Sequence, residues 1–318
     1  FYAASLVCVV GVLYRMGRWF SFGIGTEAGQ YSVWERLGHG FGAVIQTIFS
    51  RRIFSLSYAL LWDVILQGRI LKRDTVRWAM HFLIFSGFVL LLLMHALEDQ
   101  VSRPLLSPYE PTINPYMFLR NLFGAMVFVG LAIACYRRRA LRPLKRITGM
   151  ADRFAIGLLV VIIVSGFLLE AAKIISPSVF ASMVQDFAGY PADSEGVDPL
   201  KAYWSEHYGV AFPGETFAKT SAAMEEGRFM HENYCGYCHA EPKWAFVSYP
   251  VSRAIRPAAG FMDAIRMDRV LWYVHFLACF AGLALLPFTK LFHIVSTPAS
   301  LLVNGASGQG KALAGRLN

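Results

Sequence analysis

The pattern with the most specific chemistry in this sequence is a Cys-x-x-Cys-His motif formed by Cys235, Cys238 and His239. Two thiols at this spacing can form thioethers with the vinyl groups of a haem, while the histidine that follows reaches the iron. The cysteine pair could instead be a redox disulfide, which leaves His239 unexplained. It could also be half of a zinc site, for which the same region offers only His207 and His231 as further ligands. We favour a covalent haem c with His239 as its proximal ligand.

The second axial ligand of this haem is left open by the sequence. The candidates are methionines and histidines of the surrounding region, namely Met224, Met230, Met262, His207 and His231. The preceding stretch, 188–214, is acidic and punctuated by Pro and Gly, unlike a complete cytochrome domain. We therefore expect the haem to be held against the rest of this chain or against a partner.

Four of the eight histidines lie in two long apolar stretches. His81 and His95 stand 14 residues apart in the first stretch, and His275 lies 18 residues before His293 in the second. At about 100° and 1.5 Å per residue, each pair falls on one face of its helix, with members about 21 and 27 Å apart. Antiparallel packing of the two helices would set His95 opposite His275 near one membrane surface. It would set His81 opposite His293 near the opposite membrane surface. A lone intramembrane histidine often only bonds a neighbouring helix, but two matched pairs favour two bis-histidine haem b sites, with the histidines as ligands of the haem iron.

Two further polar residues have less specific interpretations. His39 could substitute for a haem ligand, but it lies among glycines in an interrupted apolar segment, where a structural or surface role is favoured. Glu170 stands near the end of an apolar stretch and could relay a quinol proton or pair with Lys173. The sequence does not decide between these roles of Glu170.

Composition indicates a membrane protein. Apolar residues make up 56% of the 318 residues and charged residues 16%, against about 45–50% and 25% in soluble domains. The net charge of +9 fits basic cytoplasmic loops better than nucleic-acid binding. We predict an all-α integral membrane protein, a bundle of five transmembrane helices with an extracytoplasmic loop region. The expected spans are Phe1–Tyr14, Trp78–Leu97, Tyr116–Tyr136, Phe154–Ile175 and Val270–Phe292. Phe1–Tyr14 would cover only about 21 Å of the roughly 30 Å needed, so we expect this helix to begin before Phe1.

Charge alternates between the segments that join these spans. Residues 15–76 carry 8 Lys or Arg against 4 Asp or Glu, and residues 136–153 carry 7 against 1. Residues 98–115 carry 1 against 3, and residues 177–268 carry 7 against 12. The positive-inside rule therefore predicts an outer N-terminus, an outer loop with the Cys-x-x-Cys-His motif, and a cytoplasmic C-terminus.

The chain therefore divides into four predicted regions. Residues 1–176 hold the first four membrane helices, with interfacial helices on the cytoplasmic face at about 31–72, in Tyr31–Phe49 and Ser55–Leu71. Residues 177–269 form the outer loop, and residues 270–293 form the fifth membrane helix. Residues 294–318 form a cytoplasmic tail, which is rich in Gly, Ala and Ser from Ser296 and is expected to be extended or poorly ordered.

The stretches "RWAMHFLIFSGFVLLLLMHALED" and "VLWYVHFLACF…FTKLFHIVSTP" resemble membrane cytochrome b subunits of the family of the nitrate reductase gamma subunit, with relatives in heterodisulfide-reductase and dissimilatory sulfite-reduction complexes. The resemblance implies five helices and two b haems, with ligands from the second and fifth helices. The histidines that would fill these positions are His81, His95, His275 and His293. The Cys-x-x-Cys-His loop is not part of the nitrate reductase pattern.

We therefore expect the quinone-reactive, electron-transferring membrane subunit of a respiratory oxidoreductase complex in a prokaryotic cytoplasmic membrane. Electrons would pass through two stacked b haems between an outer haem c or a quinone pool, menaquinone or ubiquinone, and a cytoplasmic iron–sulfur subunit. An extracytoplasmic cytochrome c or another redox subunit would be a second partner. The alternative is a non-redox anchor or a transporter whose histidines serve substrate or metal passage, although transporters usually contain repeats and broken spans.

Overall fold

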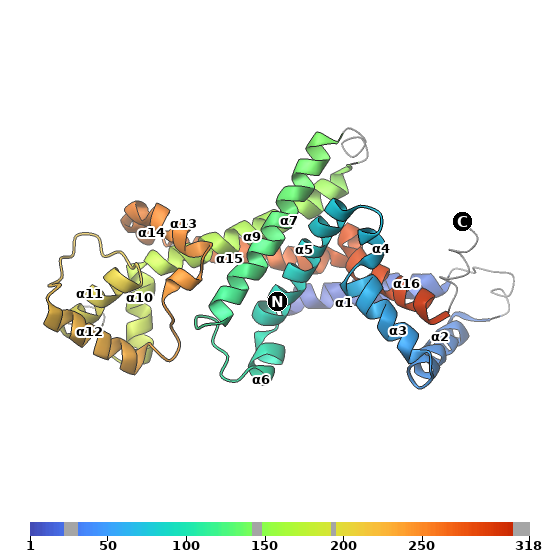
Figure 1. The fold of residues 1–318 in the computed structure, drawn as a ribbon, viewed down its shortest axis with the longest axis horizontal. Helices are drawn as coiled ribbons and strands as arrows, with labels where there is room; N and C mark the ends of the chain where they lie inside the picture. The colour runs from blue at the N-terminus through green and yellow to red at the C-terminus, as the bar shows by residue number, and fades with distance from the viewer. Residues whose placement is uncertain (22–30, 142–147, 192–194, 308–318) are drawn as a thin grey trace. The chain divides into compact units, whose positions relative to one another are not determined.

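The computed structural model of this protein describes residues 1–21, 31–141, 148–191 and 195–307 (Figure 1). Within these residues every regular element is a helix, and none is a strand. Five of the helices are long and apolar enough to cross a membrane. They are α1 (Tyr2–Ser21), α5 with its π-helical continuation (Thr75–Ala96), α7 (Tyr116–Ala140), α9 (Met150–Ile175) and α15 with the turn after it (Met267–Phe288). The prediction of an all-α protein with five spans is confirmed.

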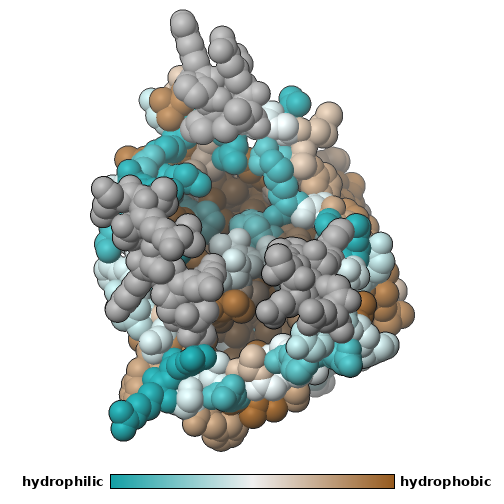
Figure 2. Space-filling model, turned by 90° about the vertical axis from the view of Figure 1, so that its right-hand side faces the viewer, coloured by the Kyte–Doolittle hydropathy of each residue, from teal (hydrophilic) through white to brown (hydrophobic). Residues whose placement is uncertain are grey.

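The surfaces of these helices suit a lipid environment. In α1, Leu6 and Leu13 are 65% and 63% exposed, and Figure 2 shows apolar, brown atoms covering much of the flanks in that view. Polar, teal atoms lie around the central hollow and at several places nearer the edge of the same face. Such exposed apolar area would be unfavourable in water and is neutral against lipid tails. Helix α1 runs to Ser21, seven residues beyond the predicted end, and its 20 residues suffice to span.

The fifth span ends earlier than predicted. Helix α15 closes at Leu285, and a short 3₁₀ turn containing Pro287 follows. Proline cannot donate the backbone hydrogen bond that a continuing helix needs, so one helix through Phe292 is a wrong prediction. A new helix, α16, begins at His293 and runs to Ser307. The prediction of an extended or poorly ordered tail is therefore also wrong for residues 296–307, and residues 308–318 lie outside the described part.

The chain forms two compact units, and the first contains residues 1–82, 135–158 and 279–318. In this unit the predicted interfacial segments are helical: α2 (Val33–Ile48), α3 (Ile53–Tyr58) with a π-helical continuation to Ile65, and α4 (Gly68–Leu71). Helix α16 packs on α3 and its continuation. Arg137 pairs with Asp74 at 2.7 Å, and Lys290 pairs with Asp152 at 2.8 Å. These ion pairs connect the two basic segments, 15–76 and 136–153, to each other and to Lys290 within one unit.

The second unit contains residues 83–134 and 159–278. Its outer region, predicted as a loop, is folded into helices around a core of its own: α10 (Pro177–Met183), α11 (Asp198–His207), α12 (Ser221–Tyr234), α13 (Ser248–Ile255) and α14 (Ala259–Ala264). Helices α11 and α12 approach closely at Gly227, where a Cβ would come within 2.1 Å of the Pro199 carbonyl oxygen. The buried residues Leu200, Trp204 and Met230 belong to the core between them. This core holds the Cys-x-x-Cys-His motif in place.

Candidate functional site

The first histidine pair, His81 and His293, lies in the first unit. His81 stands on α5, and His293 is the first residue of α16, so the Pro287 turn and the 3₁₀ turn after it separate His293 from α15. The two ring centroids are 6.2 Å apart, with the ring planes at 61°. The predicted pairing of these rings is confirmed, whereas the predicted continuous helix between His275 and His293 is not.

The second pair, His95 and His275, lies in the second unit. His95 stands on the π-helical turn Leu92–Ala96, and His275 stands on α15. Their ring centroids are 6.3 Å apart, with the planes at 45°. Gly166 of α9 faces the His275 ring, since a Cβ there would lie 3.1 Å from Cε1 of the imidazole. Glycine at this position makes room for the histidine between the helices.

Both separations fit one metal ion held between two imidazoles. An imidazole nitrogen binds a first-row metal at about 2 Å and lies roughly 1.1 Å from its ring centroid, so two imidazoles on opposite sides of one iron place their centroids about 6.2 Å apart. The observed values are 6.2 and 6.3 Å. Two stacked rings in van der Waals contact would be closer, as Trp204 and Tyr208 are at 4.3 Å.

Hydrogen bonds orient three of the four imidazoles in the same way. Nδ1 of His81 lies 2.9 Å from Oε1 of Gln67. Nδ1 of His275 lies 3.0 Å from the carbonyl oxygen of Ile162, and Nδ1 of His293 lies 2.6 Å from that of Lys290. An oxygen acceptor requires the proton on Nδ1, which leaves the lone pair of each ring on Nε2. Metal-bound histidines are usually fixed by such a bond from the second ring nitrogen.

Gln67 is a site residue that the sequence analysis missed. Its side chain is buried, at 5% exposure, and its backbone is left-handed with φ 53°. A non-glycine residue in this conformation costs about 1–2 kcal/mol, so the surroundings must enforce it. Gly68, where a Cβ would lie 2.4 Å from the Trp62 indole, allows the tight turn, and Trp78 donates to the Leu66 carbonyl oxygen at 2.8 Å. No sequence spacing indicates this contact.

Arg120 distinguishes His95 from the other three histidines. Its Nη2 lies 2.9 Å from Nδ1 of His95, and because a guanidinium only donates, this nitrogen accepts and Nε2 carries the proton. Nε of Arg120 is buried without a hydrogen-bond partner among the described residues. A metal on Nε2 of His95 requires Arg120 to take another acceptor. A haem brings two propionate carboxylates, which are suitable acceptors for a guanidinium.

The Cys-x-x-Cys-His residues form one helical turn after α12. The backbone N–H groups of Cys238 and His239 both donate to the carbonyl oxygen of Cys235, at 3.1 and 2.9 Å. Residues at i, i+3 and i+4 of such a turn lie on one face, which suits two thioethers and an axial imidazole. Cys235 is buried, and burial raises the pKa of its thiol to about 11. The thiol is therefore protonated at neutral pH, unlike the attacking thiol of a redox pair.

An aromatic cluster surrounds the motif. Trp204 meets the His239 ring edge-on with centroids 5.5 Å apart, and the Tyr208 hydroxyl lies 2.8 Å from Nε2 of His231. Burial lowers the pKa of His239 to about 4. Nδ1 of His231 and Nε1 of Trp204 are buried and have no hydrogen-bond partner among the described residues. These two orphaned polar atoms beside His239 fit a polar group that the protein atoms do not supply.

The remaining predicted residues are placed as follows. Of the candidate second ligands, Met230 and His231 lie in the region around the motif, whereas Met262 packs in a separate core with Ile175. His207 stacks on Tyr203 at 4.5 Å. No group of three or more His, Cys, Asp or Glu that could bind a metal occurs in the described ranges, so a zinc site gains no further ligands there.

Glu170 makes contacts that the sequence did not indicate, whereas His39 lies on the surface. Oε2 of Glu170 accepts hydrogen bonds from Asn121 at 3.0 Å and from the Ser248 hydroxyl. The carboxylate therefore connects α9 to α7 and to the outer region. His39 is exposed on α2 and contacts the Tyr31 ring at 5.3 Å, as a surface role predicts.

Comparison with known proteins adds partial similarities. The chain is 31% identical over 147 residues to a subunit of the dihydromethanophenazine:CoB–CoM heterodisulfide reductase of Methanosarcina thermophila, covering 44% of this chain and 52% of that protein. It is 32% identical over 120 residues to the same component of the Methanosarcina acetivorans enzyme, covering 36% and 46%. It is 23% identical over 268 residues to the EtfAB:quinone oxidoreductase of Syntrophomonas wolfei subsp. wolfei, covering 81% of this chain and 28% of that protein.

These similarities have a clear limit. The chain spans about half the length of the curated relatives that it matches first. No family model matches it, and no solved structure does. Together with the five apolar helices, the comparisons support a multi-pass membrane protein similar to components of redox enzymes.

Proposed function

We propose that this chain is the membrane electron-transfer subunit of an oxidoreductase complex, with one haem b between His81 and His293 and another between His95 and His275. The observation that carries the proposal is the pair of ring separations, 6.2 and 6.3 Å, each of which fits two imidazoles on one iron. Haem supplies one-electron redox chemistry when it is bound. The relatives, a component of a heterodisulfide reductase and a quinone oxidoreductase, support a redox role.

The protein's own residues would bind and orient the group. The Nδ1 hydrogen bonds of His81, His275 and His293 keep their Nε2 lone pairs available. They also increase the electron donation of each ring. The apolar side chains of the spanning helices exclude water and keep the local dielectric constant low.

The outer region would carry a third group. Cys235 and Cys238 would hold a haem c through thioethers, with His239 on the iron, and the one-sided turn at these residues supports this assignment. The acidic segments 98–115 and 177–268 contact each other, because the Ala240 N–H donates to the Thr112 carbonyl oxygen at 2.9 Å. A shared side for these two segments agrees with the charge rule.

The proposed membrane arrangement follows from that charge distribution. The outer loop and the N-terminus would face the extracytoplasmic side of a prokaryotic inner membrane, and the basic segments would face the cytoplasm. A cytoplasmic iron–sulfur subunit would dock on the basic face, and a quinone would react near one b haem. An extracytoplasmic cytochrome or similar redox subunit would meet the outer region.

The test is haem stoichiometry in the purified protein. Pyridine haemochrome analysis should give two b haems and one c haem, and only the c haem should remain attached on a denaturing gel. His81→Ala and His275→Ala should each remove one b haem and leave the c haem, whereas His39→Ala, on an exposed surface, should change neither. A wild-type protein without b-type absorption would refute the proposal for the histidine pairs. Cys235→Ser together with Cys238→Ser should abolish the covalent haem alone, and an unchanged gel would refute the haem c assignment.

A further inference from the structure

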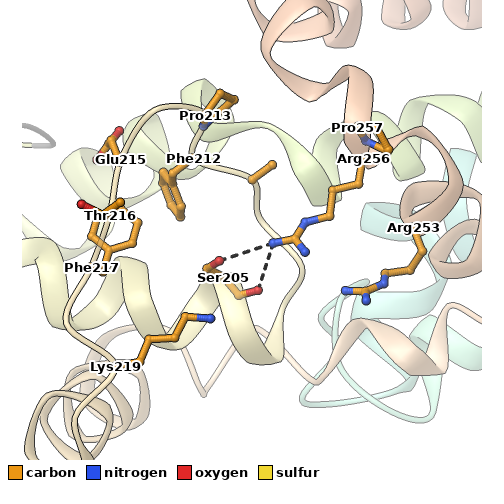
Figure 3. Close-up of a pocket in the computed structure, with 11 residues that line it drawn as sticks. Ser205, Phe212, Pro213, Glu215, Thr216, Phe217, Lys219, Arg253, Arg256 and Pro257 are labelled. Carbon is orange, nitrogen blue, oxygen red and sulfur yellow. Dashed lines mark hydrogen bonds between the residues drawn. The ribbon is translucent and has the colours of Figure 1, made fainter.

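A cavity of about 780 Å³ opens in the outer region, and no proposed haem ligand lines it (Figure 3). Its walls come from α11, from the segment after α11 and from the α13 end. The residues that matter are Ser205, Phe212, Phe217, Lys219, Arg253 and Arg256. Nothing in the proposed electron-transfer role uses this cavity.

The cavity carries a net positive charge. Lys219, Arg253 and Arg256 line it against one acidic residue, Glu215, and Figure 3 shows the three cationic side chains reaching toward Ser205. Glu215 is already paired with a lysine outside the cavity at 3.0 Å. Arg253 has no ion pair or hydrogen bond in the described portion of the chain, and it is exposed. Lys219 is paired with Glu206 at 2.7 Å, so among the three cations of the lining Arg253 is the one without a protein acceptor in the described residues.

Arg256 is held in place by the protein itself. Its Nη2 lies 3.4 Å from the Ser205 carbonyl oxygen, 3.4 Å from the Ser205 hydroxyl and 3.3 Å from the Val210 carbonyl oxygen. These contacts use one of the three guanidinium nitrogens and fix the plane of the group. An ordered guanidinium with further N–H groups is well suited to a phosphate.

The cavity lies at the end of a spanning helix. Ala211, in its wall, donates its N–H to the carbonyl oxygen of Ile175 at 3.1 Å, and Ile175 is the last residue of α9. Ile175 and Ala211 are buried in one small core with Ala259. Because α9 is long and apolar enough to cross a membrane and ends there, we expect the cavity at the depth of the lipid headgroups. Phe212 and Phe217 provide an apolar, aromatic wall, which is more favourable against a lipid than against water.

We propose that this cavity binds the phosphate of an anionic phospholipid headgroup, with Arg253, Arg256 and Lys219 as its cationic ligands. A free phosphate ion shares this chemistry, but the aromatic wall and the position at the end of α9 favour the lipid. The site would tie the outer region to the membrane surface. This proposal rests on the membrane location alone and does not depend on the haem groups.

The test compares lipid retention in native mass spectrometry of the purified full chain. With phosphatidylglycerol, the wild type should retain a bound lipid at concentrations at least about tenfold below those needed for phosphatidylcholine. Arg253→Gln with Lys219→Gln should remove this preference. The matched control is Arg228→Gln with Lys243→Gln, two exposed cations of the same outer region, and it should retain the preference.

Three outcomes would overturn the proposal. They are equal phosphatidylglycerol retention in the double variant and the wild type, loss of the preference in the control variant, and displacement of the lipid by inorganic phosphate at equal concentration. The last result would indicate a site for free phosphate. Circular dichroism of each variant should match that of the wild type, which shows that the fold is kept. Arg253→Lys keeps the positive charge and should therefore retain the preference for phosphatidylglycerol.

Discussion

Replacing Gln67 by leucine should change one haem b and leave the other unchanged. The substitution removes the oxygen that accepts from Nδ1 of His81 at 2.9 Å, in a residue only 5% exposed. A buried donor without its partner costs about 1–3 kcal/mol. Without this hydrogen bond the imidazole would also donate less electron density to the metal. That donation favours the oxidised state of the metal.

The expected size of the change in reduction potential follows from the hydrogen bond. If about 1 kcal/mol of its energy differs between the two redox states, the one-electron potential rises by about 40 mV, at 59 mV per 1.4 kcal/mol. Optical redox titration of the b absorption bands should show one potential raised and one unchanged. The measurement should be made on protein whose stoichiometry confirms two b haems.

Gln67→Gly separates the hydrogen bond from the backbone strain. Glycine also lacks the acceptor, so the potential should rise as in the leucine variant. It accepts φ 53° without penalty, so its unfolding free energy should exceed that of the leucine variant by about 1 kcal/mol. Gln46→Leu, at an exposed position of α2, is the control. Two unchanged potentials in both Gln67 variants, with two b haems present, would refute the positioning role.

Three other predictions follow from single contacts. Arg120→Gln should lower the reduction potential of the b haem at the His95–His275 pair. The reason is that a cation stabilises the reduced state by on the order of 1 kcal/mol, or about 40 mV. A shift in the potential of the other b haem instead would contradict this prediction. Gly166→Val should displace the imidazole of His275, because its Cε1 would lie 3.1 Å from the new Cβ. The substitution should lower the free energy of unfolding by about 1–3 kcal/mol. Gly157→Val, with no atom within 4 Å, should leave the absorption spectrum unchanged, and equal spectra of both variants would refute the contact. The pKa of Asp74 is held below its ordinary value of 3.8, first by the hydrogen bond from Arg137. The ionised carboxylate therefore stabilises the folded protein fully at a pH above 3.8, and this stabilisation is lost as the pH falls through the lowered pKa. Asp74→Asn should remove that part of the acid dependence of thermal unfolding below about pH 5, and an unchanged acid dependence would count against it.

The spans and the two ring pairings could be predicted because both depend on local regularity. A run of about 20 apolar residues predicts a span, and the helical period places His81 and His95 on one face. The break at Pro287 was missed because the apolar run continues past it to Phe292. The helix from His293 was missed because Gly, Ala and Ser dominate the tail composition, whereas its packing on α3 stabilises a helix.

Contacts between distant residues were beyond the reach of sequence reasoning. Gln67 precedes His81 by 14 residues across a tight turn and a short helix, and Arg120 stands 25 residues after His95. The helical period does not predict either contact, because each joins two separate elements whose relative placement depends on side-chain packing. The aromatic cluster at the Cys-x-x-Cys-His turn is missed for the same reason, since Trp204 and Tyr208 come from α11 and the residue after it, and the motif follows α12.

The two histidine pairs are not equivalent, and the difference bears on how they would work together. The pair of His81 and His293 is fixed by two oxygen acceptors, Gln67 and the Lys290 carbonyl, which favour an oxidised metal. In the pair of His95 and His275, the Ile162 carbonyl oxygen and the Ser165 hydroxyl lie beside Nδ1 of His275, and a guanidinium lies beside His95. A fixed cation favours the reduced state. If both pairs hold haem, the one beside the guanidinium should therefore have the higher potential, and an electron shared between them should reside there at equilibrium.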